Sequence, residues 1–351
     1  MSRGGLFLVV MAGGSGTRFW PKSTSKKPKQ LLSFGTTGTP TLLQQTLSRF
    51  DGLVPAENRM IVTTGSLSPA VAGQAPGVRI LAEPQGRNTA PCVYWAAREV
   101  QMLDPDGIML VMPSDHYIPD IEKFQATVRA AAGWAAQNGD LVALGVKPSR
   151  PETGYGYLRT IAASGPVGAR KVETFVEKPD LARAEEYVKS GRYLWNGGMF
   201  IWRASVILEA FDRFMPELGK AWSAAGGDAQ KAYPSMTATS IDYGVMEKAA
   251  NAVTFELDCG WDDLGSWIAL ENMADVLGAR REGGVVTGGE LLAIQSGGNI
   301  VDAPGRLVAI LGLSNLVVVE HGGAILVTRK DKAQDIKLVV DKIRQARPEL
   351  V

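Results

Sequence analysis

The sequence predicts an α/β protein with a mixed, mostly parallel sheet, followed by a small β-rich unit. Short apolar runs alternate with helical patterns over most of the chain, which is typical of βαβ units. Beyond residue 283 the chain changes to short runs of Val, Ile and Leu that Gly, Asn and Pro separate. A chain of 351 residues with 45% apolar content can form one large core and a smaller one. We therefore expect two domains, over residues 1–282 and 283–351.

The first strand is expected at Leu6 to Ala12, because an uninterrupted apolar run is typical of a parallel strand that is buried on both faces. The glycine-containing residues 148–157 are predicted to be irregular, and residues 195–198 are predicted to precede a strand. A helix is expected to begin near Ser240. The remaining expected strands are 59–63, 78–82, 108–112, 141–146, 171–176, 199–202 and 253–257, and the main expected helices are 121–137, 181–190 and 332–345.

Glycines follow the first strand at once and predict a phosphate-binding loop. Gly13, Gly14 and Gly16 let the backbone approach a ligand closely, so that consecutive N–H groups can point at an anion. Two familiar phosphate loops are excluded. No Lys followed by Ser or Thr comes after Gly16 at the P-loop spacing, and Phe19 stands near the position where a dinucleotide-binding loop needs a small residue. Positive charge for the phosphates would come from Arg18, Lys22, Lys26, Lys27 and Lys29.

Three polar segments are predicted to lie at one edge of the sheet. Residues 13–18, 83–91 and 113–116 each follow an expected parallel strand. Ligands of such sheets bind beyond the carboxyl ends of the strands. The sequence therefore predicts a ligand site at this edge.

Charge and cysteine content exclude several classes of function. With 37 basic and 36 acidic residues the net charge is +1, which argues against a general nucleic-acid or membrane-surface binder. No stretch of 18 apolar residues predicts a membrane span. Cys92 and Cys259 are too few for a disulfide framework or a zinc site, and we expect two buried thiols in a reducing cytoplasm.

Nine ordered motifs are distributed along the chain. They are GGSGTR at 13–18, PKQL at 28–31, EPQGRNTAP at 83–91, PSDH at 113–116, GYGY at 154–157, FVEKP at 175–179, WNGGMF at 195–200, SIDYGVMEK at 240–248 and GWDDLGSW at 260–267. Together they resemble the motifs of the sugar nucleotidyltransferases, and within them those of the mannose-1-phosphate guanylyltransferases. The resemblance covers residues 6–345 and implies a Rossmann-like nucleotidyltransferase core with a small C-terminal β-helical domain.

The activity that this resemblance implies is transfer of GMP from GTP to mannose 1-phosphate, with pyrophosphate as the second product. The sugar-phosphate oxygen would attack the α-phosphorus, so positioning and neutralisation of charge would supply most of the acceleration. Two alternatives stay open: a nucleotidyltransferase for another sugar or base, and a catalytically inactive regulatory subunit of the same fold. A homodimer is the candidate assembly.

The resemblance also implies a metal site for Mg²⁺, which takes one or two carboxylates plus phosphate oxygens. Asp115 and Asp263 are the candidate ligands. Asp262 is the rival for the second position, and Asp263 is preferred because the motif places the carboxylate two residues before Gly265. Asp115 has an alternative interpretation as a turn or N-cap residue.

Roles for the remaining candidates come from the same resemblance. Arg18 and Lys29 would contact the β- and γ-phosphates, Lys178 would bind the sugar phosphate, and Lys26 and Lys27 would be solvated. The base would be recognised by the backbone of residues 12–13 and by the turn 85–89. The nucleotide-binding candidates are Ala12, Gly13, Gly14, Ser15, Gly16, Thr17, Arg18, Lys29, Gln85, Asn88, Thr89 and Ser114; the sugar-binding candidates are Gly156, Glu177, Lys178 and Asn196; the catalytic candidates are Arg18, Lys29, Asp115, Lys178 and Asp263.

Overall fold

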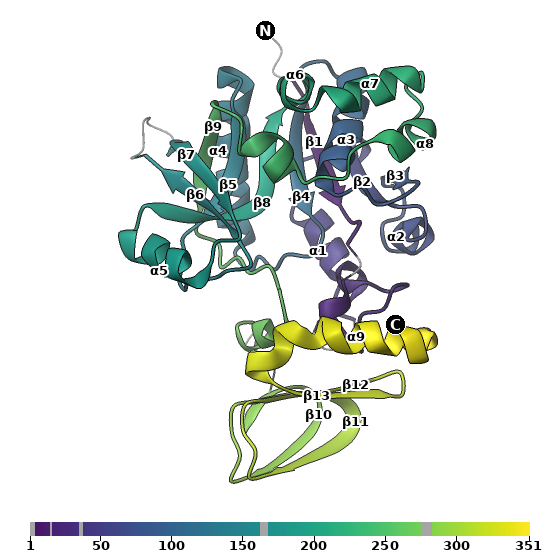
Figure 1. Ribbon diagram of the computed structural model, residues 1–351, viewed down its shortest axis with the longest axis vertical. Helices are drawn as coiled ribbons and strands as arrows, with labels where there is room; N and C mark the ends of the chain where they lie inside the picture. Colours follow the sequence, from purple (N-terminus) through teal and green to yellow (C-terminus); the bar gives the residue numbers. More distant parts are fainter. Residues whose placement is uncertain (1–3, 15, 35–37, 162–167, 275–278, 280–282) are drawn as a thin grey trace. The chain divides into compact units, whose positions relative to one another are not determined.

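The computed structural model describes residues 4–14, 16–34, 38–161, 168–274, 279 and 283–351 (Figure 1). The chain forms two compact units. Unit 1 consists of Met1–Gly13, Thr46–Ser114 and Ile118–Trp261, and unit 2 consists of Gly14–Gln45, Asp115–Tyr117 and Asp262–Val351. The domain boundary between residues 282 and 283 stays a prediction, since residues 280–282 lie outside the described residues.

Unit 1 is built on a nine-stranded sheet with the order β3-β2-β1-β4-β8-β5-β9-β7-β6. Strands β1 to β4 pair in parallel, and β5 pairs in parallel with β9. Within this sheet, only β7 and β8 are antiparallel to the other strands. The predicted mixed, mostly parallel α/β sheet is therefore confirmed. Its strands are β1 Leu6–Met11, β2 Arg59–Thr64, β3 Arg79–Glu83, β4 Ile108–Pro113, β5 Leu141–Val146, β6 Gly156–Thr160, β7 Arg170–Glu177, β8 Tyr193–Arg203 and β9 Ala252–Leu257.

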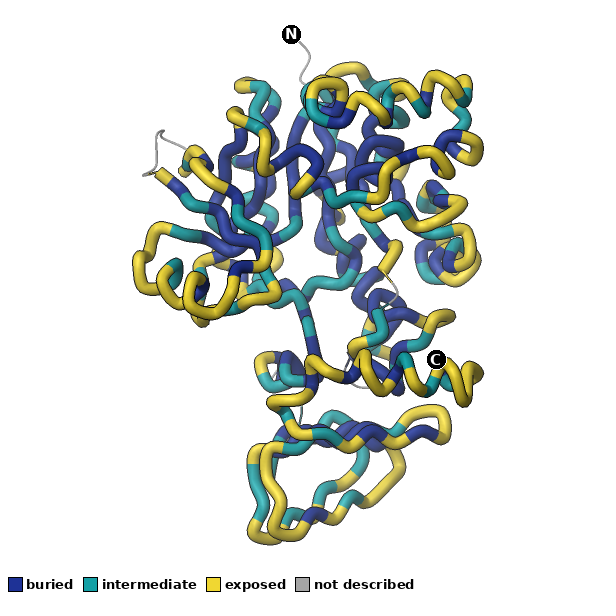
Figure 2. The backbone as a smooth tube through the Cα atoms, in the orientation of Figure 1, coloured by how far each residue is buried: buried dark blue, intermediate teal, exposed yellow. Residues whose placement is uncertain are grey.

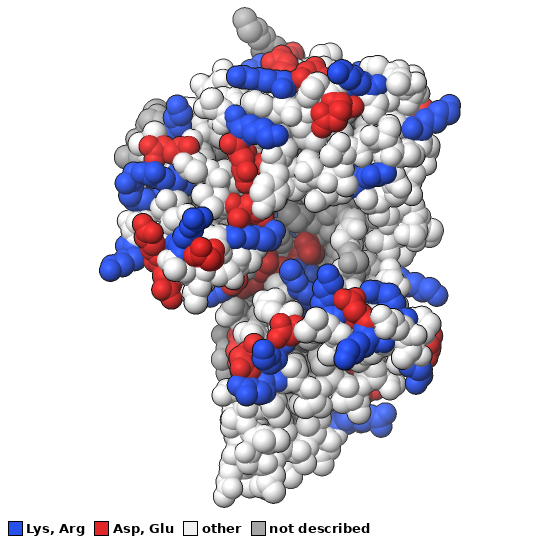
Figure 3. All heavy atoms as spheres, viewed as in Figure 1, with Lys and Arg blue, Asp and Glu red and all other residues white. Residues whose placement is uncertain are grey.

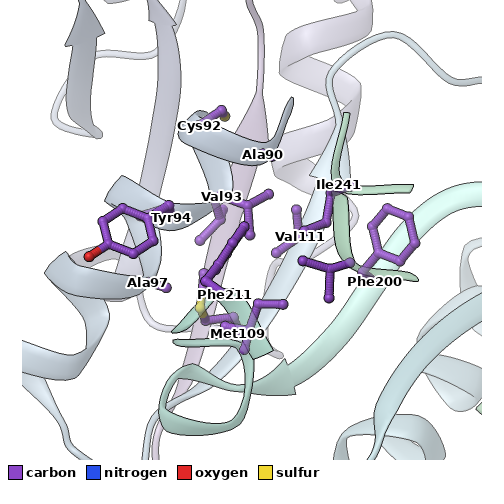
Figure 4. Close-up of a cluster of buried hydrophobic side chains, with 14 of the residues drawn as sticks. Ala90, Cys92, Val93, Tyr94, Ala97, Met109, Val111, Phe200, Phe211 and Ile241 are labelled. Atoms are coloured by element: carbon purple, nitrogen blue, oxygen red, sulfur yellow. The ribbon is translucent and has the colours of Figure 1, made fainter. Parts of the chain in front are cut away.

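Helices cover both faces of this sheet, which explains why its central strands are apolar throughout (Figures 1 and 2). Alternate side chains of a strand point to opposite faces. Val9 packs in a cluster with α3 (Thr89–Leu103) and α6 (Ala204–Phe214), whereas Leu8 and Val10 point to the other face and are also fully buried. Figure 4 shows part of the first cluster, formed by side chains of α3, β4, β8 and α6, with Val93, Met109, Val111, Phe200 and Phe211 among them.

Capping residues set the ends of the main helices of unit 1. The side chain of Asp120 accepts a hydrogen bond from the N–H of Lys123 at the start of α4 (Ile121–Asn138), and that of Asp180 accepts one from the N–H of Arg183 at the start of α5 (Leu181–Ser190). Gly139 ends α4 with φ of 65°, a conformation that glycine adopts without strain. Further helices are α1 Leu42–Ser48, α2 Ser68–Gln74, α7 Pro216–Ala224 and α8 Ala229–Ala232.

Three local predictions were wrong. Residues 195–198 belong to β8, because this strand pairs with β5 and β6 on its two sides. The segment predicted to be irregular up to residue 157 ends in β6, which begins at Gly156 and pairs with β7. Ser240 precedes only a short π-helix, Asp242–Met246, instead of a regular α-helix.

The C-terminal part of unit 2 forms a small solenoid. Its strands pair in the order β10-β11-β12-β13, and the first two pairings are parallel. Gly284 lies opposite Asn299 and Ile300 opposite Val317, so the chain returns to the same position after 15 to 17 residues. Parallel strands with such short connections require each coil to bend round on itself. The predicted β-helix-like domain is therefore confirmed, with strands β10 Gly284–Ile294, β11 Asn299–Leu311, β12 Leu316–His321 and β13 Ala324–Arg329.

Neighbouring residues of each coil belong to different clusters. Val286, Val301 and Val318 pack together in one cluster. The preceding residues, Val285, Ile300 and Val317, pack in a second cluster with α9 (Ile336–Ala346) and the aromatic side chains of Phe19 and Trp20. On the face that Figure 3 shows, the solenoid carries few charged side chains. Among the described residues, no helix is long and apolar enough to cross a membrane.

Candidate active site

The glycine loop of unit 2 is held against the short 3₁₀ helix η2, Lys29–Leu31. The side-chain amide of Gln30 donates to the carbonyl of Gly14 at 3.2 Å. Gly16 has φ of 53°, and a Cβ added there would lie 2.4 Å from the backbone nitrogen of Lys29. Only glycine allows this close approach. The loop then turns through η1, Thr17–Phe19, which leaves the Arg18 side chain exposed.

This close approach gives a first prediction. Gly16→Ala is expected to destabilise the protein by more than about 1 kcal/mol, because the new methyl group meets backbone and the left-handed φ disfavours alanine. Gly14→Ala is the matched control, since nothing lies within 4 Å of its added Cβ. Denaturant unfolding of both variants measures the difference. Equal stability of the two variants would contradict the structure of this loop.

Lys29 links two of the predicted catalytic segments of unit 2. It is buried, with 7% relative exposure. Its ammonium donates to Asp115 Oδ2 at 3.0 Å and also to the backbone carbonyl of Asp263. Burial acts to raise the pKa of Asp115, but the charges of Lys29 and His116 and the hydrogen bond from Lys29 outweigh it and lower that pKa below its ordinary value. Asp115 is therefore an ionised carboxylate at neutral pH, next to a fixed cation. We name Lys29, Asp115 and Asp263 the carboxylate–lysine cluster.

The two neighbouring aspartates of the GWDDLGSW motif differ in their surroundings. Asp262 Oδ1 accepts from the N–H of Leu264 at 2.8 Å, and Oδ2 accepts from the Asn272 amide at 3.0 Å. Both oxygens of Asp262 therefore stabilise the loop itself. The carboxylate of Asp263 instead lies beside Gly265, whose added Cβ would come within 3.1 Å of both of its oxygens. Because both oxygens of Asp262 already accept hydrogen bonds, Asp263 stays the preferred candidate ligand.

The other lysines of the loop have different surroundings. Lys26 and Lys27 are exposed, as predicted for solvated charges. Lys22 forms an ion pair with the buried Asp302 of β11. Its assignment to the phosphates is therefore wrong: its charge balances a carboxylate that the solenoid buries.

The predicted nucleotide-binding residues of unit 1 follow the carboxyl ends of parallel strands. Ala12 and Gly13 follow β1, and Ser114 follows β4, with its N–H donated to the Met11 carbonyl at 3.1 Å. The N–H of Ala12 is donated to the Val62 carbonyl at 2.8 Å, and the Ala12 carbonyl accepts from the hydroxyl of Thr63 at 2.9 Å. The backbone of Ala12 therefore joins β1 to β2, which leaves Gly13 as the better candidate for contact with a base.

The turn at residues 85–89 is anchored within unit 1. The Gln85 amide lies 2.8 Å from Nε of Arg87, and the Arg87 guanidinium donates to the Pro234 carbonyl at 2.7 Å. Asn88 has φ of 65°, and its side chain caps α3 by accepting from the N–H of Thr89 at 2.9 Å. The Thr89 hydroxyl in turn accepts from the N–H of Ile241 at 2.8 Å. These contacts fix the turn, and Gln85 and Asn88 stay exposed.

The predicted sugar-binding residues lie together in unit 1. Gly156 is paired with Glu177 across β6 and β7, and a Cβ added to Gly156 would lie 2.4 Å from Glu177 Oε2 and 3.3 Å from Cβ of Asn196. Lys178 donates to Glu177 Oε1 at 2.7 Å. Its φ of 48° is unusual for a lysine, and strained residues of this kind are frequent at functional sites. We name Gly156, Glu177, Lys178 and Asn196 the β6–β8 polar group.

Asp242 contacts this group, although it was not predicted as a site residue from the sequence. Asn196 Nδ2 donates to Asp242 Oδ1 at 2.8 Å. Burial, followed by the negative charge of Glu177, raises the pKa of Asp242 to about 6. A carboxyl group beside hydrogen-bonding side chains can bind sugar hydroxyls. The only local signal was the SIDY motif, which begins the π-helix, an element that is frequent at functional sites.

The raised pKa of Asp242 gives a second prediction. The folded state binds this proton more tightly than the unfolded state, so the contribution to stability is complete below pH 4 and is lost as the pH rises to about 6. Asp242→Asn keeps an oxygen for Asn196 but cannot ionise. The variant is therefore expected to gain stability relative to the natural protein between pH 4 and 6. Denaturant unfolding at several pH values tests this, and a constant difference would contradict it.

The structure thus places the predicted residues in three groups, each within one unit. The first is the glycine loop with the carboxylate–lysine cluster, the second comprises the strand ends and the turn 85–89, and the third is the β6–β8 polar group. Ser15 lies outside the described residues. Both cysteines are buried free thiols, as predicted.

Models of protein families match nearly the whole chain. The nucleotidyl transferase model matches residues 8–278, and the MannoseP isomerase/GMP-like beta-helix domain model matches residues 289–343. Since β10 to β13 span residues 284–329, the second match falls on the solenoid and α9.

Individual proteins agree with these family matches. The chain is 42% identical to the xanthan biosynthesis protein XanB of Xanthomonas campestris pv. campestris strain B100, over 96% of this chain and 73% of that protein. It is 38% identical to the mannose-1-phosphate guanylyltransferase of Escherichia coli K12, over 98% of this chain and 74% of that protein. The crystal structure of a mannose-1-phosphate geranyltransferase from Thermus thermophilus has a TM-score of 0.86 and 36% identity, over 97% of this chain and 99% of that chain. The chain therefore belongs to the nucleotidyl transferase family.

Proposed function

We propose that this protein transfers GMP from GTP to mannose 1-phosphate and releases pyrophosphate. An oxygen of the sugar phosphate forms a bond to the α-phosphorus of GTP, and the bond from that phosphorus to the oxygen bridging to the β-phosphorus breaks. The observation that carries the proposal is the carboxylate–lysine cluster, in which Lys29 bonds both Asp115 and the Asp263 backbone. The relative from E. coli, named for this activity, supports the choice of substrates.

The cationic residues have separate roles in this proposal. Lys29 and Arg18 neutralise charge on the β- and γ-phosphates as pyrophosphate leaves. Lys178 binds the phosphate of the sugar, while Glu177, Asn196 and the backbone of Gly156 orient its hydroxyls. The support for this second assignment is the proximity of these residues in the β6–β8 polar group. Asp242 is added as the residue that fixes the Asn196 amide.

The carboxylates of the cluster fit Mg²⁺ as the metal. Asp115 is ionised at neutral pH, and carboxylate oxygens are the ligands that this ion prefers. Within the described part of the chain, no group of three or more His, Cys, Asp or Glu residues could hold a metal ion. The proposed ligands are Asp115 and Asp263, completed by phosphate oxygens and water. Bound there, Mg²⁺ would supply positive charge to the triphosphate.

We further propose a cytoplasmic enzyme without nucleic-acid or membrane partners, and a homodimer as its assembly. The two free, buried cysteines support a reducing compartment, and the net charge of +1 supports small-molecule substrates. Size-exclusion chromatography with light scattering tests the assembly.

A pyrophosphate-release assay tests the function. The pure protein is assayed with Mg²⁺, one nucleotide and one sugar 1-phosphate at a time. The nucleotides are GTP, ITP, ATP, UTP and dTTP, and each is combined with every member of a panel of sugar 1-phosphates. We expect the highest kcat/KM for GTP with mannose 1-phosphate. A higher value for UTP or dTTP, or for another sugar, would assign the protein to another activity of the family. Release of no pyrophosphate from any pair would favour a regulatory subunit.

A further inference from the structure

The segment that carries Arg18 is hydrogen-bonded to the C-terminal part of unit 2 through Trp20. This residue follows η1 directly and is buried, with 4% relative exposure. Its indole Nε1 donates at 2.9 Å to the carbonyl of Leu350, which ends the short 3₁₀ helix η8, Pro348–Leu350. Its backbone carbonyl accepts from Nε1 of Trp267 at 3.2 Å. Trp20 therefore connects three segments that are far apart in the sequence.

Two further contacts join the same segment to the C-terminal part of unit 2. The Ser25 hydroxyl donates to a backbone oxygen of Val351 at 2.9 Å. Lys22 forms its ion pair with Asp302 of β11, whose side chain is buried. Phe19 is fully buried in the cluster that includes α9. The stretch that follows Arg18 is therefore fixed by the solenoid, α9 and η8.

These contacts matter because the glycines before Arg18 do not by themselves fix its position. Gly13, Gly14 and Gly16 have no side chain, and the backbone of glycine has wide conformational freedom. The Arg18 side chain is exposed. Misplacing a group by about 1 Å can cost about 100-fold in rate. The contacts that follow Arg18 in the sequence therefore decide where its guanidinium lies.

Trp20 also relates this segment to the one that carries Asp263. Trp267 belongs to the same GWDDLGSW motif as Asp263, begins the 3₁₀ helix η6 (Trp267–Glu271) and is fully buried. Glu271, at the end of η6, forms an ion pair with Lys330, which follows β13. Both segments are therefore attached to the same C-terminal part of unit 2, and the hydrogen bond from Trp267 to the Trp20 carbonyl joins them directly.

We propose that Trp20 is a positioning residue for the transfer, and that its bond to the Leu350 carbonyl sets the place of Arg18 relative to Asp263. The inference rests on the proposed function, in which Arg18 neutralises charge on the leaving pyrophosphate. Trp20 acts through Arg18 and not on the substrates. Because the charge on the leaving group develops in the transition state, a displaced Arg18 lowers kcat more than it raises KM.

Trp20→Phe tests the proposal, because it keeps an aromatic ring in the cluster and removes the donor to Leu350. Pyrophosphate release with GTP and mannose 1-phosphate gives kcat and KM, in the natural protein and in an Arg18→Ala background. In the natural background kcat should fall about tenfold, with each KM within about twofold. With Arg18→Ala the further loss should be less than about twofold, because the positioned group is absent. An equal loss in both backgrounds would overturn the proposal.

Hydrogen exchange gives a readout that does not depend on activity. The N–H of Trp20 donates to the Thr17 carbonyl at 3.0 Å, and that of Ser23 donates to the Phe19 carbonyl at 3.0 Å. In Trp20→Phe, exchange at these two positions should be about tenfold faster, because the stretch has lost its bond to η8. Unchanged exchange there would contradict the proposal.

Trp134→Phe is the matched control. Nε1 of Trp134 donates to Asp140 at 2.8 Å within unit 1, so this variant also loses a hydrogen bond of an indole. Its kcat, and its exchange at Trp20 and Ser23, should equal those of the natural protein. A natural protein that releases no pyrophosphate from any pair of substrates would overturn the proposed function instead.

A second variant tests the same attachment if Trp20→Phe does not fold. Ser25 is exposed, and Ser25→Ala removes only the hydroxyl that donates to Val351. kcat should fall about threefold, the effect of one weak hydrogen bond, with each KM unchanged. Ser25→Thr keeps the hydroxyl and should restore kcat. A kcat in Ser25→Ala equal to that of the natural protein would show that this attachment does not position Arg18.

Discussion

Asp115→Asn and Asp263→Asn are each expected to lower kcat by about a thousandfold or more while the protein stays folded. Both substitutions keep the shape of the side chain and remove its charge, and the proposed metal binds through that charge. In Asp115→Asn the buried Lys29 also loses its anionic partner at 3.0 Å, so the cation would be displaced from its position between the two segments. Pyrophosphate release at saturating Mg²⁺ measures the loss.

Asp262→Asn is the control for these two variants. It changes the same type of residue in the same loop, but Asp262 accepts hydrogen bonds from Leu264 and Asn272. We expect a loss of stability of about 1 kcal/mol and a kcat within about tenfold of normal. Near-normal turnover in a folded Asp115→Asn protein would refute the metal-ligand assignment. A larger loss of turnover in Asp262→Asn than in Asp263→Asn would exchange the roles of the two residues.

Lys29→Ala and Lys178→Ala are expected to impair different substrates. Lys29→Ala should lower kcat/KM for GTP by about 100-fold or more, because the buried ammonium near Asp115 is lost. Lys178→Ala should mainly raise KM for mannose 1-phosphate, because the lost ammonium belongs to the β6–β8 polar group. Initial rates with each substrate varied in turn separate the two effects.

Lys27→Ala is the matched control for both lysine variants. Lys27 is exposed and follows the same loop, so its removal should change neither KM by more than about twofold. Equal effects of Lys29→Ala and Lys178→Ala on both substrates would contradict the division of roles.

The strand ends could be predicted because the central strands can be recognised from the local sequence alone. β1 and β4 are buried on both faces, so their apolar runs identify them without knowledge of their neighbours. The residues that follow these strands then fall at one edge of the sheet. β8 could not be bounded in the same way. Residues 195–198 were predicted to precede the strand, and its pairing with β5 and β6 includes them in it.

Asp242 could not be selected as a site residue from the sequence. A buried carboxyl group is identified by its partners, and these come from distant segments. Asn196 is 46 positions from Asp242. The composition of unit 2 was hidden for the same reason, since residues 14–45 and 115–117 join the C-terminal segment through long-range contacts. By contrast, Lys29, Asp115 and Asp263 could be chosen from motifs, and the structure brings them together.

The central claim is that an oxygen of mannose 1-phosphate attacks the α-phosphorus of GTP. Mannose 1-phosphate labelled with oxygen-18 in its phosphate group tests this directly, with the products separated and weighed by mass spectrometry. No bond within the sugar phosphate breaks in the proposed reaction. All of the label should therefore be found in GDP-mannose, and the pyrophosphate should carry none. Label in the pyrophosphate, or pyrophosphate formed without labelled GDP-mannose, would contradict the proposed function.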